Sequence, residues 1–158
     1  MEPYYFPIAI TLHVLSAVIW VGGMFFAYMA LRPVAASVLD PPQRLTLWSK
    51  TLMRFFIWVW LAILIIPFTG YWMIFSGFNG FAGVAWYVHI MQALVIIMIL
   101  IFLHVFFAPY KRLRKALKEE NYQVASDNLG QIRRFIGINL IIGILTIITA
   151  AGLEHLPV

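Results

Sequence analysis

Hydrophobic positions occur in long unbroken blocks separated by charged segments. No Asp, Glu, Lys or Arg occurs in residues 3–31, 55–110 or 135–153. A hydrocarbon core about 30 Å thick needs roughly 20 apolar residues in a helix, so the first and last blocks each fit one crossing and the middle block fits two. The pattern predicts four transmembrane helices, over residues 6–31, 53–76, 84–108 and 134–152.

The blocks are continuous, whereas the lipid-facing strands of a barrel alternate over about ten residues, so the pattern excludes a membrane β-barrel. Short connections favour an all-α, integral membrane, up-down four-helix bundle, with residues 1–158 as a single domain. The composition, 63% hydrophobic and 11% charged, excludes a soluble fold. The first block opens with Met1-Glu2 and runs into Arg32 without a small-residue cleavage pattern, so we expect it to be retained and not removed as a signal peptide.

Lys and Arg set the expected orientation in the membrane. All 11 lie within residues 32–54 and 111–134. By the positive-inside rule the loops 32–52 and 109–133 face the cytoplasm, and both termini face the periplasm of a bacterial cytoplasmic (inner) membrane. The net charge of +5 then reflects topology next to anionic lipid and gives no reason to expect nucleic acid as a partner.

The two basic loops differ in their pattern. Apolar residues interleaved with charges from Pro109 to Arg134 predict a helix along the inner membrane surface. Pro33 and the pair Pro41-Pro42 predict a partly extended loop over residues 33–51.

Two histidines fall inside predicted spans, where an ionisable side chain is costly and usually faces the bundle interior. In an α-helix, the residues from His13 to Arg32 and from His89 to Lys111 span roughly 28 and 33 Å. The two histidines are therefore expected at these heights above the cytoplasmic boundary. Spans one and three are diagonal in an up-down bundle. We therefore expect the two imidazoles to share one metal atom near the outer face.

Neighbouring residues indicate which metal centre this would be. Thr69 and Gly70 are small enough to leave space for a flat ring, while Ser16 and Gln92 follow their histidines by one turn and can orient them. These residues predict a haem b with His13 and His89 as axial ligands. Bis-histidine ligation suits electron transfer or small redox chemistry with a quinone or periplasmic partner. The sequence does not decide whether the protein is a membrane oxidoreductase.

The other polar residues of the spans have less defined expectations. His104 lies near the cytoplasmic surface without a second histidine at its level, which disfavours a second haem. His155, next to Glu154, could bind a haem propionate or replace a ligand. Pro67 is expected to kink span two. Zero cysteines exclude disulfides and thiolate metal sites.

Other functions fit the same residues. Copper binding would use His13 and His89 with Met73 or Met91. Single intramembrane histidines are also often hydrogen-bonded core residues, which fits a cofactor-free structural or assembly protein. A homo-oligomer also remains open.

Part of the sequence resembles a known family. Leu12 to Met24 followed by Leu31-Arg32-Pro33, together with Arg54-Phe55-Phe56, Thr69 to Trp72 and Ala108-Pro109-Tyr110, is similar to the bacterial copper resistance protein D (CopD) domain family. The resemblance implies copper import or resistance.

A more distant similarity is to the HemJ-type protoporphyrinogen oxidases, four-helix membrane proteins that bind haem b. It is carried by the spacing of His13, Trp20 and Gly23, by Trp86, and by Arg134 before Asn139. Gln92 stands near the position where that family has a lysine, so the resemblance does not extend to its oxidase activity.

Overall fold

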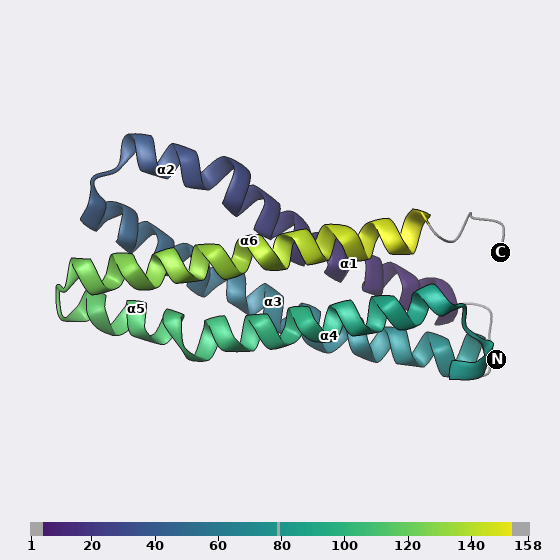
Figure 1. Ribbon diagram of the computed structural model, residues 1–158. Helices are drawn as coiled ribbons and strands as arrows, with labels where there is room; N and C mark the ends of the chain where they lie inside the picture. Colours follow the sequence, from purple (N-terminus) through teal and green to yellow (C-terminus); the bar gives the residue numbers. More distant parts are fainter. Residues whose placement is uncertain (1–4, 79, 153–158) are drawn as a thin grey trace.

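The computed structural model describes residues 5–78 and 80–152, which are helical almost throughout (Figure 1). The elements in chain order are α1 (Tyr5–Phe26), the π-helix η1 (Ala27–Leu31), α2 (Arg32–Val38), α3 (Pro41–Gly77), the 3-10 turn η2 (Phe81–Gly83), α4 (Trp86–Phe107), α5 (Pro109–Lys118) and α6 (Tyr122–Gly152). No strand occurs in this part of the chain.

Four helical stretches are long and apolar enough to cross a membrane: Tyr5–Val38, Pro41–Gly77, Trp86–Lys118 and Tyr122–Gly152. The predicted all-α membrane bundle with four spans is therefore confirmed. Helix α1 packs most closely on α3, and α4 on α6. The start of α1 and the end of α6 lie at the same end of the bundle (Figure 1).

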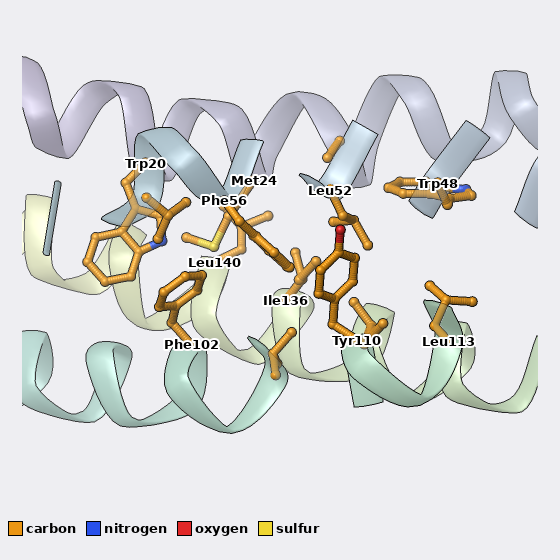
Figure 2. Packing of buried hydrophobic residues seen from close by; sticks show 14 of the residues in the cluster. Trp20, Met24, Trp48, Leu52, Phe56, Phe102, Tyr110, Leu113, Ile136 and Leu140 are labelled. Carbon is orange, nitrogen blue, oxygen red and sulfur yellow. The ribbon is translucent and has the colours of Figure 1, made fainter. Parts of the chain in front are cut away.

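Aromatic side chains form the centre of the bundle (Figure 2). Trp20 of α1 and Phe56 of α3 both pack edge-on against Phe102 of α4, with ring centroids 6.4 and 5.3 Å apart. Helix α6 contributes Ile136 and Leu140 to the same core. Large rings therefore join α1, α3 and α4, and aliphatic side chains of α6 complete the core.

Glycines allow α1 and α3 to approach each other. A Cβ at Gly23 would collide with the Phe55 ring, and one at Gly77 would lie 2.8 Å from the ring of Phe6. Small residues at helix interfaces permit such close packing inside a membrane, where no hydrophobic effect drives helices together.

The two basic segments are more helical than the sequence suggested. The expectation of a partly extended 33–51 loop is wrong: α2 continues α1, a short turn at Leu39–Asp40 follows, and α3 begins at Pro41. Proline is favourable in the first turn of a helix, where its missing N–H has no intrahelical acceptor, so the proline pair starts α3.

The segment from Pro109 to Arg134 does not form a separate surface helix. Helix α5 and the first turns of α6 pack against each other as a helical hairpin, in which Leu113, Leu129 and Ile132 are buried. The apolar stripe read from the sequence is covered by a neighbouring helix, so the hairpin extends the bundle beyond the membrane-spanning part.

The orientation of the chain in the membrane remains a prediction. Because the chain has no cysteine, single introduced cysteines can be labelled to test it. We expect Ala82→Cys, in the η2 connection, to react with a membrane-impermeant maleimide in intact cells stripped of their outer membrane. Ser37→Cys, in exposed α2, should react only after lysis, because the basic end faces the cytoplasm. The reverse labelling pattern would invert the topology.

Candidate functional site

His13 is held by α3. It is half-buried on α1, and its Nδ1 lies 2.9 Å from the Oγ1 of Thr69. The Thr69 hydroxyl donates its own hydrogen to the carbonyl of Ile65 at 2.6 Å, so its oxygen accepts from the Nδ1–H of His13. This arrangement favours the Nδ1–H tautomer, in which Nε2 carries the lone pair.

Gly70 makes room for the imidazole. A Cβ at this position would lie 3.2 Å from Cε1 and 3.7 Å from Nδ1 of His13. The structure therefore brings together three of the residues that the sequence singled out, His13, Thr69 and Gly70. The space beside the small residues, which was expected to admit a flat ring, is occupied by the histidine itself.

Two further predicted residues lie inside the bundle. Ser16 is buried one turn deeper than His13 on α1. Gln92 of α4 is half-buried, and its Nε2 is enclosed without a hydrogen-bond partner. An unpaired buried amide is costly, so this nitrogen is available to a water molecule or a ligand.

His89 has different surroundings from His13. Its side chain is exposed, and its ring stacks on Phe81 of η2 at 6.3 Å between centroids. Trp20 contacts Phe102, and α1 and α4 run in the same direction, so His13 is level with about Val95. His89 is then about 9 Å nearer the outer end at 1.5 Å per residue. The structure gives the two imidazoles different partners, Thr69 for His13 and Phe81 for His89.

The remaining histidines are not part of the His13 site. His104 is exposed near the other end of α4, with its ring edge-on to Phe135 at 4.9 Å. His155 lies outside the residues that the structure describes. Among the described residues, no three His, Cys, Asp or Glu side chains are grouped so that they could hold a metal ion.

A haem b does not fit the described residues. His13 fills the space beside Gly70, His89 is exposed and stacks on Phe81, and two cavities inside the bundle measure about 20 and 10 Å³. A cavity of this size admits about one water molecule. Both cavities are lined by residues other than His13 and His89. The expected bis-histidine haem therefore has no support in this geometry.

Asn139, which was not among the predicted site residues, is the most enclosed polar residue of α6. It is 3% exposed, its Nδ2 donates to the carbonyl of Met98 at 3.4 Å, and its Oδ1 has no partner. The larger cavity lies beside it, between Trp20 and Met24 of α1 and the aromatic core. In the sequence, the position of Asn139 in the middle of an apolar block was the sign that it is a buried polar residue.

Removal of the Thr69 hydroxyl tests the arrangement of His13. We expect Thr69→Val to lower the free energy of unfolding in detergent by about 1 kcal/mol, because the buried Nδ1–H loses its acceptor. Nitrogen-15 NMR of labelled histidine should show that the Nδ1–H tautomer of His13 is no longer favoured. Thr69→Ser should preserve both properties, and an unchanged tautomer in Thr69→Val would disprove the hydrogen bond.

Comparison with protein families identifies the chain. The sequence model of the family described as Copper resistance protein D (CopD) matches residues 49–153, which include Thr69, Gly70, most of α3 and all of α4, α5 and α6. Comparisons with curated proteins and with solved structures give no match. The match extends over more than half of a chain that has four candidate membrane spans. This multi-pass membrane protein belongs to the copper resistance protein D family.

Proposed function

We propose that this protein handles copper in the bacterial inner membrane, in import or resistance, and that His13 contacts the ion. The family match carries the copper assignment. The choice of His13 rests on its geometry: Nδ1 is hydrogen-bonded to Thr69, so Nε2 is the nitrogen that would bind the copper ion. Neutral imidazole is a good copper ligand, and a hydrogen bond to its second nitrogen orients it.

A thioether is the natural second ligand in a chain without cysteine. Met73 lies four residues after Thr69 and so on the same face of α3, one turn nearer the outer end, and it is half-buried. Imidazole and thioether together favour Cu(I) over harder cations. Met91 of α4, also half-buried, lies on a helix that has little direct contact with α1, so we assign it no contact with His13.

The small number of ligands suits copper as cargo. Since the described residues contain no group of three strong ligands, the ion would be held weakly. Passage across a membrane requires sites that bind the ion well enough to admit it and loosely enough to release it. One histidine supported by Thr69, with a methionine nearby, meets this requirement better than a closed structural site would.

Titration of the purified full-length protein with Cu(I) against a coloured competing chelator tests the proposal. We expect one bound copper per chain, and at least a tenfold loss of affinity in His13→Ala, which corresponds to about 1.4 kcal/mol. Met73→Leu should lower the affinity to a smaller extent. Cells that depend on the protein should show a changed copper content with His13→Ala.

Histidine variants elsewhere provide matched controls. His104→Ala and His89→Ala remove the same side chain from exposed positions and should leave copper affinity unchanged. Absence of bound copper in the wild type, or loss of copper in His89→Ala but not in His13→Ala, would refute the proposal. An optical spectrum with a Soret band in the purified protein would return the assignment to haem.

A further inference from the structure

Arg32 and Arg133 line one small cavity at the end of the bundle opposite His13, and Arg44 of a third helix lies within electrostatic reach of Arg133. Arg32 begins α2, Arg44 lies in the first turns of α3, and Arg133 belongs to α6. Arg133 is half-buried and within electrostatic reach of both other guanidinium groups. We refer to Arg32, Arg44 and Arg133 as the arginine cluster.

Aromatic residues give the cluster a defined base. The Arg32 guanidinium lies over the Tyr28 ring, with 4.9 Å from Cζ to the ring centroid. A small cavity of about 10 Å³ is lined by Arg32, Arg133, Tyr28 and the buried Trp48. Guanidinium groups supported by rings keep their donors in a fixed orientation, which a mobile surface lysine does not.

The backbone of η1 determines where Tyr28 and Arg32 lie. The N–H of Arg32 bonds to the carbonyl of Ala27, five residues earlier, so the turn holds one residue more than an α-helical turn. On α6, Gly137 lets the tyrosine approach, because a Cβ there would lie 3.2 Å from the Tyr28 hydroxyl. Such single π-turns are frequent at functional sites, where they redirect side chains.

The positive charge of the cluster is not compensated within the described residues. The one ion pair in residues 5–78 and 80–152 joins Lys115 and Glu119, at 3.8 Å on the exposed face of α5. Three guanidinium groups held close together repel each other, and half-burial of Arg133 reduces the screening by water. A bound anion would relieve this repulsion.

The cluster lies where a membrane presents phosphate. Arg32 directly follows the first uncharged block, and Arg133 and Arg134 directly precede the last one. Phosphate groups of lipids are found at this depth, and guanidinium binds phosphate oxygens through paired hydrogen bonds.

We propose that Arg32, Arg44 and Arg133 form a binding site for a phosphate group at the basic end of the bundle. The headgroup of an anionic lipid and free phosphate share this chemistry, and the position at the membrane boundary favours the lipid. This inference is independent of the copper assignment, because it concerns other residues at the opposite end of the molecule.

Thermal unfolding of the full-length protein in detergent tests the proposal. We expect added phosphatidylglycerol to raise the midpoint above that obtained with equal phosphatidylcholine, and native mass spectrometry to show retained phosphatidylglycerol. Arg133→Gln should weaken this binding by about tenfold, since it removes one paired contact. Arg133→Lys retains the charge but not the planar guanidinium group, so its phosphatidylglycerol binding should lie between that of the wild type and that of Arg133→Gln.

Arg134→Gln is the matched control. Arg134 is the next residue on the same helix, exposed, and carries the same charge, so its loss should leave lipid binding nearly unchanged. If Arg133→Gln is unstable without any anion, Arg32→Gln replaces it, because Arg32 is exposed and its removal leaves no cavity.

The same unfolding measurement with inorganic phosphate and no lipid, compared with chloride at equal ionic strength, distinguishes a lipid headgroup from free phosphate. Stabilisation by phosphatidylglycerol alone identifies the lipid headgroup, and stabilisation by phosphate that Arg133→Gln abolishes identifies a small-anion site. Equal losses in Arg133→Gln and Arg134→Gln would mean diffuse charge attraction and overturn the proposal. An absence of stabilisation by either anion would also overturn it.

Discussion

The close contact between α1 and α3 is the interaction on which the other features depend. Gly23 and Gly70 each leave the space that a large ring from the facing helix fills, Phe55 in one case and His13 in the other. In a membrane, helices gain little from the hydrophobic effect and associate through such packing and through hydrogen bonds. The same contact that joins two helices therefore also buries a histidine and gives its Nδ1 a partner.

The two ends of the bundle have different chemistry because different side chains pack between the helices at each end. At the outer end, the α1–α3 interface encloses His13 with Thr69, and the result is a single oriented nitrogen donor. At the basic end, η1 directs Tyr28 and Arg32 toward α6, and no carboxylate among the described residues forms an ion pair with the arginine cluster. Between them lies an aromatic core around Phe102, which has no charged group.

Two polar atoms in the interior lack hydrogen-bond partners. Gln92 Nε2 and Asn139 Oδ1 are both enclosed without partners, on helices that pack against each other. Polar groups at membrane depth are costly and are usually retained for a function or for helix association. Both residues lie within the region that matches the family.

Hydropathy and charge alone determined the number of spans, the all-helical class and the expected orientation, because bilayer thickness fixes the length of each apolar block. Family membership was also readable from local residue patterns. The surroundings of His13 and His89 were not, since depth counted along the chain does not give the register between diagonal helices or the direction of a side chain. Only the tertiary structure turned His13 toward Thr69 and left His89 exposed. It also decided that the segment from Pro109 to Arg134 folds as a hairpin, because a neighbouring helix, and not the membrane surface, covers its apolar stripe.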